Sequence, residues 1–247
     1  MFKKQALPMA LCLSTSCVAI AGEAVTGIDL SGIDFSKATV ISVGTNGVLA
    51  SLDNAGAVAS GEKMKNYGFS AGVSHEKGSF RLGVLLADLQ VAANGGNKER
   101  TLATAKTLLE GLVALEAPNA LVTSVAQLFT AIQHGADPKA VAQLARPMIY
   151  PFVKEFIEKE GHLQSFFMGE WAETVYLAAS VIRDGKPGNM EIGLRGATFI
   201  RELQPGTPTG VIDALKAVAE ASKAEKPDAR TADSVISAIE HLKDFLG

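Results

Sequence analysis

Apolar side chains recur at helical spacing from about residue 78 to the end of the chain. In the segment 79–93 they fall at Phe80, Val84, Ala87 and Val91, steps of four, three and four residues. Such steps place side chains on one face of an α-helix. Further leucines cover the other faces of this segment, so the pattern predicts a central, buried helix.

The same spacing predicts further helices, separated by glycine, proline and asparagine. Asp137 followed by Pro138 indicates a helix start, because aspartate caps the first turn and proline fits there. Pro147 and Pro151 lie inside the following segment and each removes a backbone donor, so we expect a kink or break near them. The expected segments are about 98–115, 119–134, 138–160, 163–184, 190–203, 209–224 and 231–246.

About eight helices with short connections indicate an all-α fold, either a helical bundle or a short array of helical hairpins. We assign this all-helical domain to residues 77–247. Residues 22–76 are rich in glycine, serine, asparagine and alanine and show no sustained alternation, so they predict an irregular N-terminal arm. No apolar run after the N-terminus reaches about 18 residues, so we expect no transmembrane segment in the mature chain.

The first 21 residues have the three-part layout of an export signal. Lys3 and Lys4 form a basic start, an apolar stretch covers 6–13, and Ala19-Ile20-Ala21 has the pattern that signal peptidase accepts. We therefore expect 1–21 to be a signal peptide cleaved after Ala21. This predicts a periplasmic protein.

Cys17 supports an alternative form of export. The small residues Ser14, Thr15 and Ser16 precede it, as in a bacterial lipoprotein signal, although Ser14 stands where leucine is expected. In that alternative the protein is a lipoprotein anchored at Cys17. Cleavage after Ala21 would instead remove both cysteines of the chain, Cys12 and Cys17, and with them all thiol chemistry.

Composition excludes several classes of function. With 23 basic and 26 acidic residues the net charge is −3, which gives no general electrostatic reason to bind nucleic acid. The four histidines, His75, His134, His162 and His241, do not fall at metal-ligand spacing. We find no catalytic motif and predict no metal, no cofactor and no enzymatic activity.

The segment 150–176 holds seven of the chain's 15 aromatic residues. Aromatic residues at helical spacing usually belong to a core, and we favour that interpretation. The alternative is an aromatic-lined pocket for an apolar or ring-shaped ligand. Its candidate binding residues are Tyr150, Phe167, Trp171 and Tyr176.

Charged residues also occur within the apolar helices. Arg81 and Asp88 lie seven apart on the first helix, and Glu170 and Glu173 flank Trp171 on a later one. Buried charges need partners, so we expect Arg81, Asp88 and Glu170 to belong to a buried polar cluster. Structural pairs such as Arg81–Glu170 or Asp88 with an arginine would satisfy them. Paired carboxylates for acid–base catalysis are the alternative.

Two segments, Phe80–Leu89 and Gly169–Leu177, resemble paired segments of uncharacterised, exported, all-helical bacterial envelope proteins. The second has a Gly-x-Trp-x-Glu-like pattern, with Gly169, Trp171, Glu173 and Tyr176. The resemblance covers about residues 78–184. It implies an envelope location and an α-helical fold, and it implies no activity. It also implies that Arg81, Asp88, Glu170 and Trp171 meet in the middle of the bundle.

These observations predict a soluble, non-enzymatic helical protein of the bacterial envelope that acts as a binding or interaction module. Its partner would be another envelope protein or an apolar small ligand. One alternative is a periplasmic carrier of such a ligand, which should have a pocket near Trp171 and Tyr176. The other is an enzyme that uses Asp88, Glu170 and Arg81.

Overall fold

The computed structural model describes residues 69, 73–186, 188, 190–224 and 226–246. The predicted signal peptide 1–21, the alternative lipidation site Cys17 and nearly all of the predicted arm 22–76 lie outside these residues. The described residues belong to one unit of the chain, within Asp34–Gly247.

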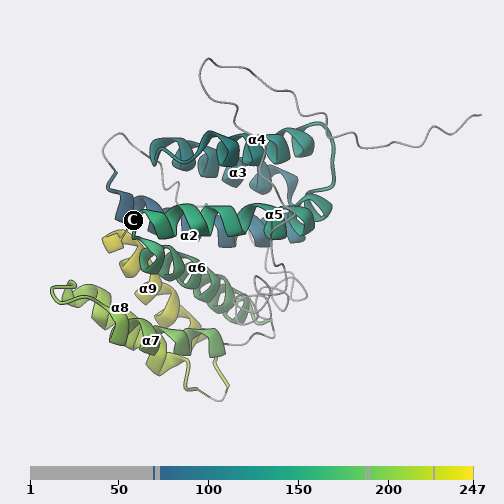
Figure 1. Ribbon diagram of the computed structural model, residues 1–247. Helices are drawn as coiled ribbons and strands as arrows, with labels where there is room; N and C mark the ends of the chain where they lie inside the picture. The colour runs from purple at the N-terminus through teal and green to yellow at the C-terminus, as the bar shows by residue number, and fades with distance from the viewer. Residues whose placement is uncertain (1–68, 70–72, 187, 189, 225, 247) are drawn as a thin grey trace, which may run out of the picture. The chain divides into compact units, whose positions relative to one another are not determined.

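Helices follow one another with short connections throughout the described residues, and no strand occurs among them. The prediction of an all-α fold is confirmed. The helices are α2 (His75–Asn94), α3 (Lys98–Ala114), α4 (Asn119–Gln133), α5 (Pro138–Lys159), α6 (Leu163–Arg183), the 3-10 helix η2 (Glu191–Arg195), α7 (Gly196–Glu202), α8 (Thr209–Ala221) and α9 (Ala229–Leu246) (Figure 1).

Side-chain caps explain several of these boundaries. The side chain of Ser74 accepts a hydrogen bond from the backbone N–H of Lys77, and that of Asn97 accepts one from Arg100. Asp137 accepts from the N–H of Lys139, with Pro138 in the first turn of α5. Each bond satisfies a donor that the first helical turn leaves without an intrahelical partner. The predicted start of α5 is therefore confirmed.

We expected a kink or a break near Pro147 and Pro151, and the break does not occur. Helix α5 runs without interruption through both prolines. Each proline removes one backbone hydrogen bond, but α5 also packs against α2, α4 and α6. Packing on three neighbours compensates for the missing donors and keeps the segment helical.

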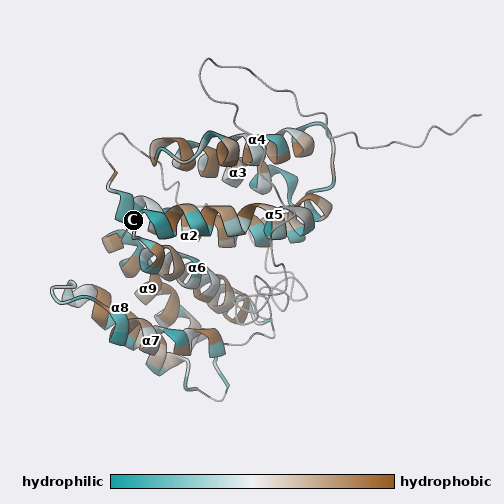
Figure 2. Cartoon of the chain, in the orientation of Figure 1, coloured by the Kyte–Doolittle hydropathy of each residue, from teal (hydrophilic) through white to brown (hydrophobic). Residues whose placement is uncertain are grey.

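Helices α2 and α6 form the most extensive helix pair among the described residues. Helices α3, α4 and α5 continue from α2 on one side of this pair, while η2, α7, α8 and α9 pack on the other side of α6 (Figure 1). Apolar residues recur along these helices (Figure 2). They form two buried clusters, one involving α2 to α6 and the other involving α2, α6 and the elements from η2 to α9.

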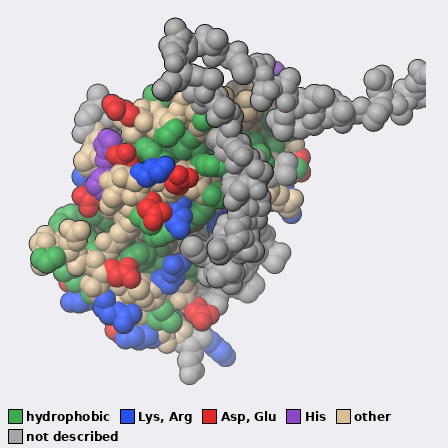
Figure 3. Space-filling view, in the orientation of Figure 1, with side chains coloured by type: hydrophobic (Ala, Val, Ile, Leu, Met, Phe, Trp, Pro, Cys, Tyr) green, Lys and Arg blue, Asp and Glu red, His purple; other side chains and the backbone are tan. Residues whose placement is uncertain are grey.

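The outer face drawn in Figure 3 carries acidic, basic and apolar side chains intermingled with one another. Among the described helices, none is long and apolar enough to span a bilayer.

Candidate functional site

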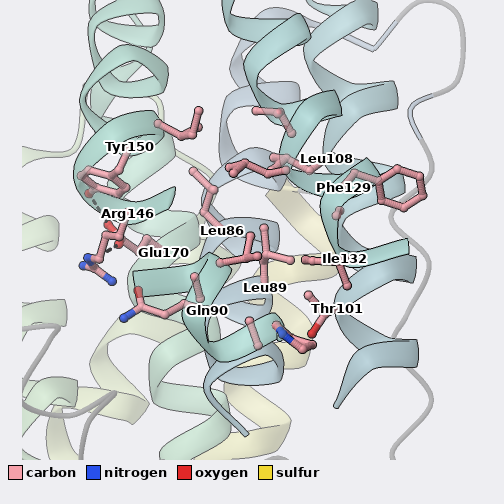
Figure 4. A pocket seen from close by; sticks show the side chains of 18 residues that line it. Leu86, Leu89, Gln90, Thr101, Leu108, Phe129, Ile132, Arg146, Tyr150 and Glu170 are labelled. Atoms are coloured by element: carbon pink, nitrogen blue, oxygen red, sulfur yellow. Dashed lines mark hydrogen bonds and ion pairs between the residues drawn. The ribbon is translucent and has the colours of Figure 1, made fainter. Parts of the chain in front are cut away.

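An apolar cavity of about 80 Å³ lies among α2, α3, α4 and α5 and is partly open (Figure 4). We call it the α2–α5 pocket. Helix α2 contributes Leu86 and Leu89 to its wall, α3 contributes Leu108, and α4 contributes Ile132. Apolar walls with a few polar groups are typical of small-ligand sites.

Helical spacing places these side chains on the inner faces of their helices. Leu86 and Leu89 lie three apart on α2, and Val125 and Ile132 lie seven apart on α4, so each pair faces the same way. Small side chains interrupt the apolar walls at Ala93, Ala105 and Ala142. Because alanine fills less volume than leucine, these positions leave room between the helices. The pocket therefore arises where small residues stand on the packed faces.

One end of the pocket is polar. Arg146 and Tyr150 lie four apart on α5, and Glu170 of α6 faces them (Figure 4). The hydroxyl of Tyr150 donates a hydrogen bond of 2.8 Å to Glu170 Oε2. Arg146 Nη2 lies 3.9 Å from Glu170 Oε1, and its guanidinium carbon lies 5.4 Å from the centre of the Tyr150 ring. We call these three residues the Arg146 group.

Burial controls the ionisation of the Arg146 group. It raises the pKa of Glu170, and the hydrogen bond from Tyr150 and the charges of Arg146 and Arg195 oppose this rise only in part. Burial also lowers the pKa of Arg146, against the attraction of Glu170 and Tyr150. It raises the pKa of Tyr150 as well, and the neighbouring Glu170 charge adds to this rise. Tyr150 is therefore a neutral hydrogen-bond donor, and Arg146 is only partly compensated.

Arg146 has a donor that the described residues leave without a hydrogen bond. Its Nη2 atom is buried, and no described residue accepts from it at hydrogen-bond distance. The 3.9 Å approach of Glu170 is too long for a hydrogen bond. A buried donor without an acceptor costs about 1–3 kcal/mol. This cost makes the position suited to an additional acceptor.

A second buried polar group connects α2 with α3. Arg100 donates to both carboxylate oxygens of Asp88, from Nη2 to Oδ1 and from Nε to Oδ2, the latter at 3.4 Å. The hydroxyl of Thr104 donates to Oδ2 at 2.9 Å. Burial lowers the pKa of Arg100, but the charge of Asp88 and the hydrogen bonds to it outweigh burial and raise it overall. Asp88 and Arg100 thus form a well-compensated structural pair.

Glu173 of α6 and Lys243 of α9 form a third buried pair, through a direct hydrogen bond from Nζ to Oε2. The Nζ atom also lies 4.2 Å from the centre of the Tyr176 ring. Burial raises the pKa of Glu173 and the charge of Asp88 raises it further, while Lys243 and Arg100 act in the opposite direction. This pair therefore interacts electrostatically with the Asp88–Arg100 pair and ties α9 to the rest of the helices.

The four aromatic residues predicted to bind a ligand lie in different surroundings. Tyr150 lines the α2–α5 pocket, but Phe167, Trp171 and Tyr176 are not part of its lining. Trp171 is 1% exposed, donates from Nε1 to the backbone oxygen of Ile192 at 2.9 Å and packs edge-on against Phe199. Phe167 packs against the hydrophobic core beneath Lys154, and Tyr176 lies beneath Lys243. The α2–α5 pocket therefore lies beside Tyr150 and not beside Trp171.

Arg81, Asp88 and Glu170, predicted as one polar cluster, belong to separate groups. Asp88 pairs with Arg100, and Glu170 interacts with Tyr150 and Arg146. The guanidinium carbon of Arg81 lies 5.9 Å from the centre of the Phe69 ring.

Sequence reasoning missed Arg100, Arg146 and Lys243. Arg146 had a detectable signal, because it precedes Tyr150 by one helical turn. Lys243 had one too, because it follows Ile239 at i+4 on the apolar face of α9. Arg100 had no comparable periodic signal. Its partner Asp88 is 12 residues away on another helix.

Within the described ranges, no three histidine, cysteine, aspartate or glutamate residues come together as a metal site. The chain matches no protein-family model, no curated protein and no solved structure. Fold and site therefore define a class by architecture. It is an all-α protein with a small apolar pocket that has an arginine, a tyrosine and a glutamate at one end.

Proposed function

We propose that this protein is a binding module whose α2–α5 pocket takes a small, largely apolar ligand. The observation that carries the proposal is the apolar cavity of about 80 Å³ with polar groups gathered at one end. An engineered apolar cavity of about 150 Å³ accommodates benzene. The pocket is about half that size, so a short alkyl chain or part of one ring fits inside, and the rest of a ligand extends through the open side.

The surroundings of the buried acids support binding over catalysis. Asp88 accepts hydrogen bonds from Arg100 and Thr104, and Glu170 accepts one from Tyr150. General acid–base catalysis needs a carboxyl group that can reach a substrate proton. Glu170, the acid that lines the pocket, already accepts a hydrogen bond from the neutral hydroxyl of Tyr150. The enzyme that would use Asp88, Glu170 and Arg81 together is therefore the less favoured proposal.

We further propose that the protein acts in the bacterial envelope. The support is the export pattern ending at Ala21 and the resemblance of Phe80–Leu89 and Gly169–Leu177 to exported helical proteins. The pocket favours a carrier of a small ligand, and interaction with another envelope protein is the second candidate. Expression in a Gram-negative host followed by intact-mass measurement tests the location. A chain that starts at Gly22 supports the periplasmic form, a lipid-modified Cys17 supports the anchored form, and an unprocessed chain contradicts both.

Calorimetric titration of the full-length protein with 1-hexanol tests the binding proposal. This probe is apolar and uncharged, so it examines the pocket walls. Ala105→Leu and Ala142→Leu enlarge side chains that line the pocket from opposite helices. Ala103→Leu adds the same atoms at an exposed position of α3 and is the matched control.

We expect 1-hexanol to bind the wild-type protein and Ala103→Leu equally. It should bind the two filled variants at least tenfold more weakly, because the added methyl groups occupy its space. Circular dichroism and thermal unfolding establish that each variant is folded. No binding to the wild-type protein, or equal binding to all four proteins, would overturn the proposal.

A further inference from the structure

Arg100 and Arg146 are both largely buried, and they have very different partners. The side chains of Arg100 and Arg146 are 19% and 20% exposed. Arg100 donates twice to Asp88. Arg146 has Glu170 only at 3.9 Å, and its Nη2 atom forms no hydrogen bond with any described residue. Asp88 therefore compensates the charge of Arg100 through two hydrogen bonds. Arg146, at the pocket wall, has no such partner among the described residues.

Glu170 is held in a way that prevents it from compensating Arg146. Its Oε2 atom accepts the hydrogen bond from Tyr150. Its Oε1 atom is the one that stays 3.9 Å from Arg146. The hydrogen bond from Tyr150 thereby holds the carboxyl group of Glu170 close to Tyr150 and away from the guanidinium of Arg146. The guanidinium keeps donor capacity for an acceptor that comes from outside the protein.

Arg146 is the cation that lines this end of the pocket, and its Nη2 atom has no acceptor among the described residues. Glu170 Oε1 stays 3.9 Å away and compensates the charge of Arg146 only in part. The charge of Arg195 also acts on Glu170, but Arg195 is exposed and is not part of the pocket lining. An anionic group is therefore attracted here. A carboxylate fits best, because its two oxygens match the paired N–H groups of a guanidinium.

We infer that the ligand of the α2–α5 pocket is a monocarboxylic acid with a short apolar tail. Its carboxylate accepts hydrogen bonds from Arg146, and its tail lies along Leu86, Leu89 and Leu108. This inference rests on the proposed function and adds the chemical class of the ligand. The polar end of the pocket selects the head group, while the apolar walls bind the tail.

Titration with hexanoate and 1-hexanol separates the two parts of this inference, because the probes share a six-carbon chain and differ in the head group. We expect the wild-type protein to bind hexanoate at least tenfold more tightly than 1-hexanol near neutral pH. Arg146→Met keeps much of the side-chain volume and removes the charge. It should weaken hexanoate binding at least tenfold and leave 1-hexanol binding within about twofold. Arg201→Met, at an exposed arginine of α7, is the matched control and should change neither affinity.

The possible failures have different meanings. If the wild-type protein binds both probes equally, or if Arg146→Met weakens both to the same extent, the carboxylate inference is overturned and the apolar pocket stands. If the wild-type protein binds neither probe, the proposed function itself fails.

A second measurement covers the case that Arg146→Met does not fold. Carbon-13 NMR of carboxyl-labelled hexanoate bound to the wild-type protein follows the ionisation of its head group. Contact with Arg146 should lower the pKa of the bound acid below that of the free acid. An unchanged or raised pKa would overturn the inference.

Discussion

Gly83 of α2 and Gly169 of α6 bring the backbones of the two helices into direct contact. A β-carbon on Gly83 would lie 2.1 Å from the carbonyl oxygen of Phe166, and one on Gly169 would lie 2.0 Å from that of Phe80. Glycine is the residue that permits such an approach, because it has no β-carbon. Glu170 directly follows Gly169, so this crossing also fixes the distance between the polar end of the pocket and the walls that α2 supplies.

Replacing Gly169 with alanine should therefore destabilise the protein. The new β-carbon meets the backbone of α2, which cannot move away without shifting the helix. We expect the free energy of unfolding to fall by about 2 kcal/mol or more, despite a gain in helix propensity of up to about 1 kcal/mol. Urea unfolding followed by circular dichroism measures this change.

Gly210→Ala is the matched control. A β-carbon there would meet the ring of Phe245, whose side chain is 50% exposed and free to rotate away. We expect this variant to change the free energy of unfolding by less than about 1 kcal/mol. Equal effects at positions 169 and 210 would contradict the view that the crossing of α2 and α6 is tight.

Loss of one partner in the Asp88–Arg100 pair should cost more than loss of both. Asp88→Asn leaves the guanidinium of Arg100 without its counter-charge and should lower the free energy of unfolding by about 3 kcal/mol. The double substitution Asp88→Leu with Arg100→Met removes both charges and should recover a large part of that loss. A double-mutant cycle in urea that compares Asp88→Leu, Arg100→Met and the double substitution measures the coupling. Additive effects of the two substitutions would contradict a direct pair.

The helices themselves could be predicted from local signals. The spacing of Phe80, Val84 and Val91 indicates one face of α2, and Asp137 with Pro138 marks the start of α5. Both signals involve residues less than four turns apart, where the geometry of a helix leaves little freedom. The unbroken course of α5 through Pro147 could not be predicted in this way, because it depends on packing against other helices.

The chemical type of a tertiary partner could be predicted from the sequence, but the partner residue itself could not. Asp88, inside an apolar helix, indicates that a cation lies opposite, but the choice of Arg100 depends on how α2 and α3 are rotated. The spacing of Trp171 favours a core over a pocket without excluding the pocket, and the burial of Trp171 and its hydrogen bond to Ile192 place it in the core. The pocket arises from small residues such as Ala105 on opposing faces. Such a difference in side-chain volume between facing helices leaves no periodic pattern in the sequence.

The pKa of Glu170 makes a prediction about pH. Burial raises this pKa above its ordinary value of 4.5 in the folded protein. The folded state therefore binds the proton more tightly, and the stability that this gives is complete below about pH 4.5. It is lost as the pH rises through the folded-state pKa. Glu170→Gln cannot titrate, so the wild-type protein should lose stability relative to this variant as the pH rises above about 4.5. Urea unfolding of both proteins at a series of pH values measures the difference.

Asp228 provides a control of opposite sign. Its carboxylate accepts hydrogen bonds from the backbone N–H and the hydroxyl of Thr231, which lower its pKa. This contribution is present above the ordinary pKa of the group and is lost as the pH falls through the folded-state value. The wild-type protein should therefore gain stability relative to Asp228→Asn as the pH rises toward the ordinary value of 3.8, below the range in which Glu170 acts. If both comparisons changed in the same direction, the pKa of Glu170 would not be raised in the folded protein.

The substitution Trp171→Phe tests whether Trp171 belongs to the hydrophobic core or to the ligand-binding pocket. The substitution removes the hydrogen bond to the buried backbone oxygen of Ile192 and leaves space beside Phe199. We expect the free energy of unfolding to fall by about 2 kcal/mol, measured by urea unfolding. The affinity for 1-hexanol should stay within about twofold of the wild-type value, because Trp171 is not part of the lining of the α2–α5 pocket. A variant with unchanged stability that no longer binds 1-hexanol would place the ligand beside Trp171, and the pocket assigned to Tyr150 and Arg146 would then be wrong.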